Sequence, residues 1–466
     1  MITTDFPVEG APVEISAGEH ALRRLDPAAA PFRVVEIELS EPAAVRPVTA
    51  GAPYAFSRPP IQGSVLALVR LHGAPLGTVT AEIADPAHAT DVLMAKASQE
   101  LAAAIAAHHA RDETPLPRVP GRSLLRVAES SPACLWRRAD ALALQPMISV
   151  VVASRERPAQ LARCLDSLVR QCYPRFEVIV VDNDPVTDDT QRLVRHRYFG
   201  EVSYTREYRR GLANAHNRGL AVARGQIVAF TDDDVIVDES WLAAIAEGFY
   251  VSEDVCCVTG LILPAELDTP AQIMLEAQGG FAKGFAPAYH SLRQPGDDRL
   301  FPFTAGRLGS GANMAFTSEA LRRLGGFDPA LGTGTAARGG DDLLAFFRAA
   351  ASGHGIVYQP SAIVWHHHYR EFAEAEKQAY GYGVGLGAYL TAAIAREPRM
   401  LPKLLRLLGP GISYAIAQLR SGNRDEQTQS SVWSRRTAAA RRRGLIRGPF
   451  AYARSRWQSR GRERGR

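Results

Sequence analysis

Cysteine is scarce in this chain, and the few cysteines form no recognisable pattern. There are five among 466 residues, and no two have the spacing of a C-x-x-C pair or of a disulfide framework. Isolated cysteines of this kind usually behave as small apolar side chains in proteins of a reducing compartment. The sequence therefore does not indicate a disulfide-stabilised secreted domain.

Long apolar runs are also missing. The opening residues, MITTDFPVEGAPVE, have neither the basic start nor the apolar run of a secretory signal. The longest uncharged stretch, between Lys377 and Arg396, contains four glycines. It falls short of the ~20 mostly apolar residues that a membrane span needs. These absences predict a cytoplasmic protein.

Negative charge is nearly absent from one segment. Between Arg435 and Arg466 there are twelve Arg, no Lys and one acid, Glu463. This segment therefore carries a net charge of +11, whereas the whole chain carries only +5. We expect a disordered basic tail over residues 421–466. Such tails are commonly solvated, and some bind anionic surfaces. The alternatives are simple solubility or peripheral contact with an anionic membrane at its inner face, and no nucleic-acid partner is expected.

The 46% of hydrophobic residues is enough for a sizeable core, and the length suggests two or three domains. Residues 32–40, 63–73 and 77–84 read as strands, and residues 86–111 have a helical pattern. They predict an N-terminal accessory α+β region over residues 1–121. A helical linker over 122–146 would follow it, and C-terminal helices are expected over 371–420.

Residues 147–370 show a different pattern, in which strands and helices alternate. The apolar strand MISVVVAS is followed by the helical pattern RPAQLARCLDSLVRQ and by a second strand, FEVIVVDND, and the alternation then continues. This order predicts an α/β domain with a doubly wound, mostly parallel sheet. Ligands in such sheets bind outside the carboxyl ends of the strands. We therefore expect Ser154, Asp182 and residues 232–234 to converge there.

The motif TDDD, residues 231–234, follows a buried strand. Strand residues two apart share a face, so Asp232 and Asp234 are predicted to lie together. Paired carboxylates suit Mg²⁺ or Mn²⁺ bridging a diphosphate. The alternative is a solvated acidic turn or a helix N-cap.

Several ordered motifs give the chain a family resemblance. The segments ISVVVASRERPAQLARCLDSLVRQ, FEVIVVDND, GLANAHNRGLAVARGQIVAFTDDDVIVDESWL, GSGANMAFTSEALRRLGGFDPALGTGT and GGDDLLAFFRA occur in series between about residues 148 and 369. This series resembles family 2 glycosyltransferases of the glycosyltransferase A fold. The resemblance implies transfer of a sugar from a nucleotide diphosphate sugar to an acceptor hydroxyl, with inversion and a Mn²⁺ or Mg²⁺ ion.

The resemblance also implies roles for particular residues. Asp182 would hydrogen-bond the nucleotide base, and Asp232 and Asp233 would face the donor. Asp234 would be the principal metal ligand. The residues carried over as donor-binding are Ser154, Glu156, Asp182, Asp232, Asp233 and Asn313, and those carried over as metal-binding are Asp234, Asp232 and His366. One departure is that His216 stands where the family often has Arg, so a basic donor contact would come from elsewhere.

The GGDD motif contains the implied catalytic pair. Asp342 matches the family's catalytic base, and Asp341 stands where the family usually has Glu. The alternative is an acidic pair that stabilises a helix N-terminus. The preceding segment, residues 332–340, is glycine-rich and is expected to be a mobile loop or a closing lid.

The run His366, His367 and His368 suggests a zinc site at first sight, but neighbouring strand residues point to opposite faces. The family pattern implies that His366 approaches the donor's metal, with His368 on the same face. Two rival functions are a nucleotidyltransferase of similar architecture and an inactive nucleotide-sugar-binding protein. The first strand-to-helix turn, ASRERP, has no glycine for a phosphate loop, and all three acid sites are present, which disfavours both.

Overall fold

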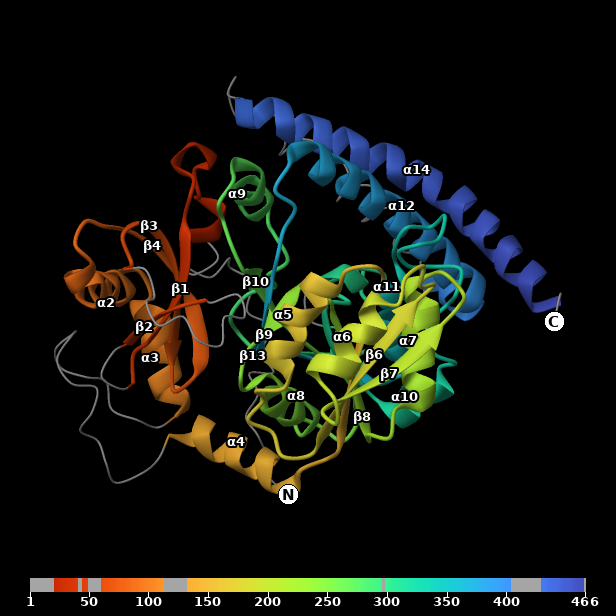
Figure 1. Ribbon diagram of the computed structural model, residues 1–466, viewed down its shortest axis with the longest axis horizontal. Coiled ribbons are helices and arrows are strands. Elements are labelled where there is room, and N and C mark those ends of the chain that lie inside the picture. Colours follow the sequence, from red (N-terminus) through yellow and green to blue (C-terminus); the bar gives the residue numbers. More distant parts are fainter. Residues whose placement is uncertain are drawn as a thin grey trace.

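The structure is a computed structural model that describes residues 21–40, 44–48, 60–112, 132–295, 298–403 and 429–464. Its largest element is a nine-stranded sheet with helices on both faces, and a separate four-stranded sheet lies beside it (Figure 1). The α/β class predicted from the sequence is confirmed. The N-terminal part of the predicted linker, residues 122–131, and the predicted helix over residues 404–420 lie outside the described residues.

The first half of the large sheet has the predicted alternation. Its elements are β5 (Ile148–Ser154), α5 (Pro158–Leu168), β6 (Phe176–Asn183), α6 (Asp189–Arg197), β7 (Val202–Glu207), α7 (Leu212–Val222) and β8 (Ile227–Asp232). Strands β7, β6, β5 and β8 lie side by side in that order, and all are parallel. Alternate residues of β5 enter opposite cores, since Val151 packs with α7 and Val150 packs with α5. Burial on both faces explains why these strands are apolar throughout.

The second half makes the sheet mixed. Its elements are β9 (Val235–Val237), α8 (Trp241–Phe249), β10 (Val255–Pro264), α9 (Pro270–Ala277), β11 (Ala288–His290), η3 (Ala305–Arg307), β12 (Asn313–Thr317), α10 (Ser318–Arg323), α11 (Asp341–Ala351) and β13 (Gly355–His366). Strand β12 is antiparallel to both of its neighbours, β8 and β10. Strands β9 and β11 are antiparallel to β13. An antiparallel strand needs no crossover helix, which is why sequence alternation alone did not predict these pairings.

The accessory region is a small α+β unit, as predicted. Its elements are η1 (Pro27–Ala29), β1 (Arg33–Glu38), β2 (Ala44–Pro47), β3 (Gly63–Leu71), β4 (Ala74–Ile83), η2 (Pro86–His88), α2 (Ala89–Glu100) and α3 (Ala102–Arg111). The sheet order is β2-β1-β3-β4, with β1 and β3 parallel. The linker helix α4 (Ala133–Leu144) then leads into β5.

The basic tail is helical in its described part, so the prediction of a disordered tail over residues 421–466 is wrong for residues 429–464, and the rest of that range lies outside the described residues. Helix α14 (Gln429–Arg464) runs alongside α12 (Phe372–Arg396), and η4 (Pro398–Met400) follows α12 (Figure 1). Arginine is a good helix former, and a charged sequence folds when one face can be buried. Here the buried face includes Ala440, Ala451 and Tyr452.

Glycines bring α12 and α14 into backbone contact. A Cβ atom on Gly383 would lie 2.0 Å from the carbonyl oxygen of Arg441, and one on Gly387 would lie 2.3 Å from that of Leu445. A Cβ on Gly448 would meet the backbone of α12 at 2.5 Å. The glycines of both segments are therefore the residues that let the helices pack.

The predicted lid, residues 332–340, is bonded to its surroundings. Gly332 N–H donates to the carbonyl of Gly339 at 3.1 Å, and Leu212 N–H donates to the carbonyl of Thr333 at 2.9 Å. Ala336 N–H donates to Ser455 Oγ of α14 at 3.1 Å. The loop is thus fixed to α7 on one side and to α14 on the other.

Candidate active site

Three candidate metal ligands converge where β8 and β13 end. Asp232 is the last residue of β8, and a two-residue turn of Asp233 and Asp234 leads into β9. Because β9 pairs with the end of β13, the backbone N–H of His367 donates to the carbonyl of Asp234 at 3.0 Å. One ligand atom from each of Asp232, Asp234 and His366 lies within 4.8 Å of the others.

The charges in this group favour a cation. Burial, and then the neighbouring Asp234, raise the pKa of Asp232 to about 7. The Oδ1 atom of Asp234 is buried and has no hydrogen-bond partner in the described part of the chain, and His366 Nε2 lies 3.4 Å from it. Oxygen ligands with one imidazole suit a divalent ion. The residues present therefore fit the implied metal.

His366 is oriented by a short relay. Its Nδ1 lies 3.1 Å from Nδ1 of His368, whose Nε2 lies 2.5 Å from a carboxylate oxygen of Glu276. The carboxylate requires a proton on His368 Nε2, and burial lowers the pKa of His368, which keeps that ring neutral. The Nδ1 atom of His368 then accepts a proton from His366. Nε2 of His366 faces Asp234 Oδ1 at 3.4 Å; burial lowers the pKa of His366, but the interaction with Asp234 outweighs burial and raises that pKa. A metal ion bound here would take the place of the Nε2 proton.

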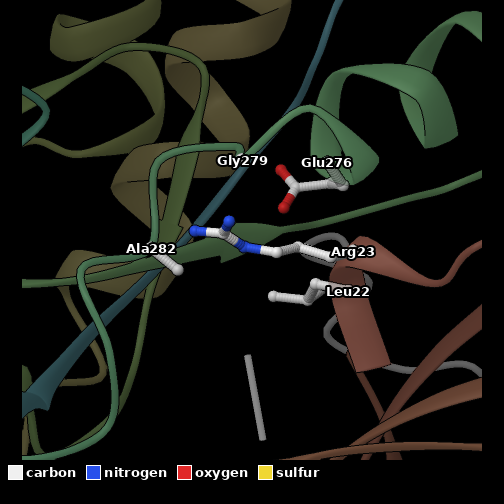
Figure 2. Close-up of a pocket in the computed structure, with 5 residues that line it drawn as sticks. All are labelled: Leu22, Arg23, Glu276, Gly279 and Ala282. Carbon is white, nitrogen blue, oxygen red and sulfur yellow. The ribbon is translucent and has the colours of Figure 1, made fainter. Parts of the chain in front are cut away.

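The outer end of the relay faces a small pocket. It is lined by Leu22, Arg23, Glu276, Gly279 and Ala282. Figure 2 shows the Glu276 carboxylate above the side chains of Arg23 and Leu22. The accessory region therefore covers the back of the relay. His367 is separate from it and points to Glu266, at 3.7 Å.

Asp233 is turned away from the metal group. Its carboxylate accepts from Ser154 Oγ at 2.7 Å and from Arg157 Nη1 at 3.3 Å. The same Arg157 nitrogen lies 3.4 Å from Asp234. Ser154 therefore holds the turn in place, and Arg157, which was not singled out in the sequence, is the cation beside the site.

Asp182 lies at the end of β6, and only one of its two carboxylate oxygens accepts a hydrogen bond from the described residues. Its Oδ2 accepts from the Tyr204 hydroxyl at 2.7 Å, and its buried Oδ1 has no hydrogen-bond partner among the described residues. Burial raises the pKa of Asp182. Glu156 is used differently, because its carboxylate accepts from the backbone N–H groups of Val186 and Thr187. It fixes a loop beside Asp182.

The GGDD motif starts α11, and its two acids have different surroundings. Asp342 is partly exposed and accepts from the N–H groups of Gly311 at 2.9 Å and Leu343 at 2.8 Å. Burial by neighbouring atoms, and then the charge of Asp341, raise its pKa to about 6. Asp341 is 4% exposed and lies 3.5 Å from His216 Nδ1, and the His216 ring packs between two phenylalanines. Asp342 is therefore the acid that can reach a substrate.

Comparison with known proteins gives this geometry its context. Residues 149–305 match the family model of Glycosyl transferase family 2. A glucosyl-dolichyl phosphate glucuronosyltransferase from Haloferax volcanii is 24% identical over 197 residues, which are 39% of this chain and 56% of that protein. The chain carries a family 2 glycosyltransferase domain.

Other similar proteins were found at comparable distance. A pre-mycofactocin glycosyltransferase from Mycobacterium tuberculosis is 27% identical over 241 residues, which are 50% of this chain and 46% of that protein. The chain thus matches about half the length of these relatives. Among solved structures, a mannosyltransferase from Pyrobaculum calidifontis in complex with GDP-Man and Mn²⁺ aligns with a TM-score of 0.41 and 22% identity, over 68% of this chain and 92% of that one.

A tyrosine that the sequence did not single out lies close to the candidate active site. Tyr382 of α12 is half-exposed, and desolvation raises its pKa, with further contributions from the charges of nearby acids that include Asp234 and Asp342. Its ring packs edge-on against Phe281, 6.2 Å away, which in turn packs on His366 at 5.4 Å. Tyr382 is therefore joined to His366 through the ring of Phe281.

One predicted donor residue lies elsewhere. Asn313 is 1% exposed, and its Oδ1 accepts from Trp241 Nε1 at 2.9 Å. Its Nδ2 donates to the carbonyls of Leu261 and Ala362. The expectation that Asn313 lines the sugar site is wrong, because the glycosyltransferase sheet uses this side chain to join β12 to its neighbours in the core. Both amide hydrogens are used inside the core, so the buried side chain has no donor left for a ligand.

Proposed function

We propose that this chain is an inverting glycosyltransferase that uses a nucleotide diphosphate sugar. The observation that carries the proposal is the pairing of a carboxylate–histidine group with a separate, partly exposed carboxylate. The first comprises Asp232, Asp234 and His366, and the second is Asp342. After desolvation, the charges of Asp234 and Asp342 both contribute to the raised pKa of Tyr382, which supports a location of the two acid sites near the same side chain. The family 2 domain supports this assignment.

In the proposed reaction, Asp342 acts as the general base. The acceptor oxygen forms a bond to the anomeric carbon while its proton passes to the Asp342 carboxylate. The bond from that carbon to the diphosphate breaks, and the nucleoside diphosphate leaves with the electron pair. A carboxylate with a pKa of about 6 is ionised near neutral pH and is a stronger base than an ordinary aspartate. Asp341, which lies 3.5 Å from His216, would position it.

Asp234, Asp232 and His366 would hold a divalent ion, Mn²⁺ or Mg²⁺. When bound, such an ion neutralises the charge that develops on the leaving diphosphate. The Oδ1 atom of Asp234, which faces His366 Nε2, and the histidine relay that orients His366 support this role. The free Oδ1 of Asp182 would accept a hydrogen bond from the nucleotide base.

A screen of nucleotide sugars tests the proposal. The purified protein is incubated with each donor and Mn²⁺ or Mg²⁺, and release of nucleoside diphosphate is measured. Hydrolysis or transfer with one donor, abolished by EDTA, is the expected result. Retained configuration in the product would contradict inversion, and activity after exhaustive chelation would contradict the metal assignment.

We also propose that α14 contacts an anionic membrane surface. Ile446, Phe450 and Trp457 are 73%, 68% and 78% exposed, and spacings of four and seven residues place them on one helix face. Arg442, one turn before Ile446, lies on the same face. Exposed apolar side chains among arginines are typical of interfacial helices. No helix in the described part of the chain is long and apolar enough to cross a membrane.

Sedimentation with vesicles tests this contact. The double variant Phe450→Ser, Trp457→Ser should bind phosphatidylserine vesicles more weakly than the unchanged protein. Phe199→Ser is the matched control, since Phe199 is 87% exposed but lies just before β7. Equal binding by the double variant and the control would refute the proposal.

A further inference from the structure

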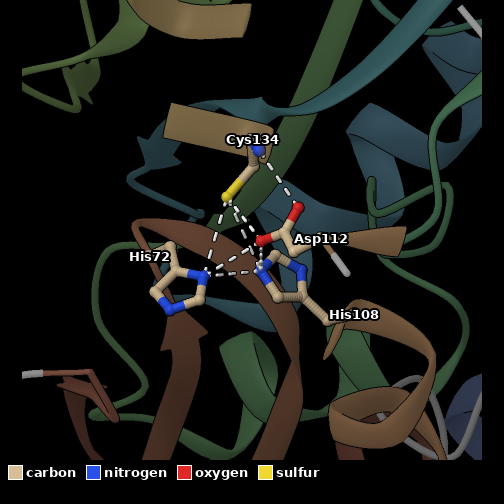
Figure 3. Close-up of side chains that lie close together, drawn as sticks. All are labelled: His72, His108, Asp112 and Cys134. Atoms are coloured by element: carbon tan, nitrogen blue, oxygen red, sulfur yellow. Dashed lines mark hydrogen bonds and ion pairs between the residues drawn. The ribbon is translucent and has the colours of Figure 1, made fainter. Parts of the chain in front are cut away.

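A second group of ligating side chains lies in the accessory region, formed by residues that the proposed transfer reaction does not use. It consists of His72, His108, Asp112 and Cys134. His72 lies in the turn between β3 and β4, His108 and Asp112 are at the end of α3, and Cys134 is at the start of α4. Figure 3 shows one atom of each side chain directed at a common point.

The distances between these atoms are close to the edges of a tetrahedron around one metal ion. For zinc, bond lengths of about 2.0 Å to nitrogen or oxygen and about 2.3 Å to sulfur give N–N and N–O edges near 3.3 Å and N–S edges near 3.5 Å. The two ring nitrogens, His72 Nδ1 and His108 Nε2, are 3.2 Å apart. They lie 3.1 and 3.0 Å from Asp112 Oδ2, and 3.6 and 3.8 Å from Cys134 Sγ.

The sixth edge is shorter, and its cause is a hydrogen bond. Cys134 Sγ donates to Asp112 Oδ2 at 2.8 Å, where a zinc site would have about 3.5 Å. Burial, and then Asp112, raise the pKa of this thiol to about 12. A metal ion would take the place of the thiol proton and separate the two atoms.

Hydrogen bonds alone account poorly for the arrangement. Two ring nitrogens and the thiol all face the single atom Asp112 Oδ2, while Oδ1 is already the acceptor for the backbone N–H of Cys134 at 3.0 Å. If both histidines donate to Oδ2, their protons meet across the 3.2 Å between the nitrogens. A cation at the centre removes this conflict, because all four atoms then present lone pairs to it.

We propose that these four side chains bind a structural zinc ion. Thiolate and imidazole ligands favour zinc, and four protein ligands leave no open position for catalysis. The side chains of Asp112, His108 and His72 are 1%, 4% and 13% exposed, so the site is largely shielded from solvent.

The site would fasten the accessory region to the glycosyltransferase domain. Its ligands come from the accessory sheet, from α3 and from α4. Helix α4 packs on α8 of the catalytic domain, where Arg137 Nε lies 3.9 Å from Glu247. The ion therefore joins elements on both sides of residues 113–131 and fixes the start of the helix that leads into β5.

Metal analysis of the full-length protein, purified under reducing conditions, tests the proposal. We expect about one zinc per chain that remains after dialysis against a weak chelator. Cys134→Ser should lose this zinc, and Cys172→Ser, which changes an exposed cysteine, should keep it. Asp234→Asn should also keep it, because that residue belongs to the other metal group.

A cobalt experiment keeps the test decisive if Cys134→Ser fails to fold. The unchanged protein, stripped of zinc and given Co²⁺, should show the visible bands of tetrahedral cobalt and a thiolate-to-cobalt charge-transfer band. Absence of tightly bound zinc together with absence of the thiolate band would overturn the proposal. So would zinc that is retained by folded Cys134→Ser, or zinc that is lost from Asp234→Asn.

Discussion

Replacing Asp342 with Asn gives the sharpest test of the proposed reaction. The side chain keeps its size, and its oxygen can still accept from the N–H of Gly311, but it no longer takes a proton. General base catalysis contributes about 10²–10⁴-fold, so turnover should fall by about that factor. Donor affinity should change little, since the carboxylate–histidine group at the ends of β8 and β13 is intact.

The pH dependence of the unchanged enzyme gives an independent readout. Burial, and then Asp341, raise the pKa of Asp342 to about 6, and the base works only when ionised. The value of kcat/KM should therefore fall as the pH drops through 6, by about tenfold per unit below it. Replacing Asp341 with Asn removes a negative charge that raises this pKa, so the same fall should move to lower pH.

The assay measures donor binding by calorimetry and turnover separately for both variants. Near-normal turnover of Asp342→Asn would refute the assignment of the base. Loss of turnover in Asp341→Asn with normal turnover in Asp342→Asn would exchange their roles. A shift of the acidic limb to higher pH in Asp341→Asn would contradict the electrostatic argument.

Three further outcomes follow from the same structure. Chelation by EDTA should abolish transfer, added Mn²⁺ or Mg²⁺ should restore it, and Asp234→Asn should weaken binding of the nucleoside diphosphate, all measured by product release and titration. Gly383→Ala places a methyl group 2.0 Å from a backbone oxygen and should lower the free energy of unfolding by about 1–3 kcal/mol, which a denaturant titration measures. Gly381→Ala on the same helix is the control and should not lower it, because the nearest neighbour of its methyl group lies at 4.0 Å. Gln in place of Glu276 should weaken metal binding at the candidate active site, because the carboxylate that orients the histidine relay is lost, and isothermal titration with Mn²⁺ measures the change.

Local patterns predicted the first half of the fold well. The strands around Val151 and Val180 are buried on both faces, so their apolar runs alone identify a parallel sheet. Ser154 and Asp233 meet as predicted, because they come from the ends of the neighbouring parallel strands β5 and β8, whose carboxyl ends share an edge. Asn313 misled the sequence interpretation because a buried amide that joins strands looks the same as one that faces a ligand.

Features formed by segments that are far apart in the sequence could not be predicted from it. His72 and Cys134 are 62 positions apart, and no spacing rule connects a turn, a helix end and a helix start. The order of α14 was missed because its glycines are favourable only opposite the glycines of α12. Tyr382 gave no signal either, since its place in the site depends on how α12 lies across the sheet.

The contact between α12 and the segment before the proposed catalytic acids has a consequence for the synthesis of this chain. A Cβ on Gly340 would lie 2.6 Å from the carbonyl of Gly385, so the α12 backbone rests directly on the residue that precedes Asp341. The helix that backs α12 begins at residue 429, well after those acids in the order of translation. A nascent chain would thus carry every acid of the site before it acquires the support that holds them in place. A nick or a premature stop between α12 and α14 would leave a protein that binds donor but transfers sugar poorly.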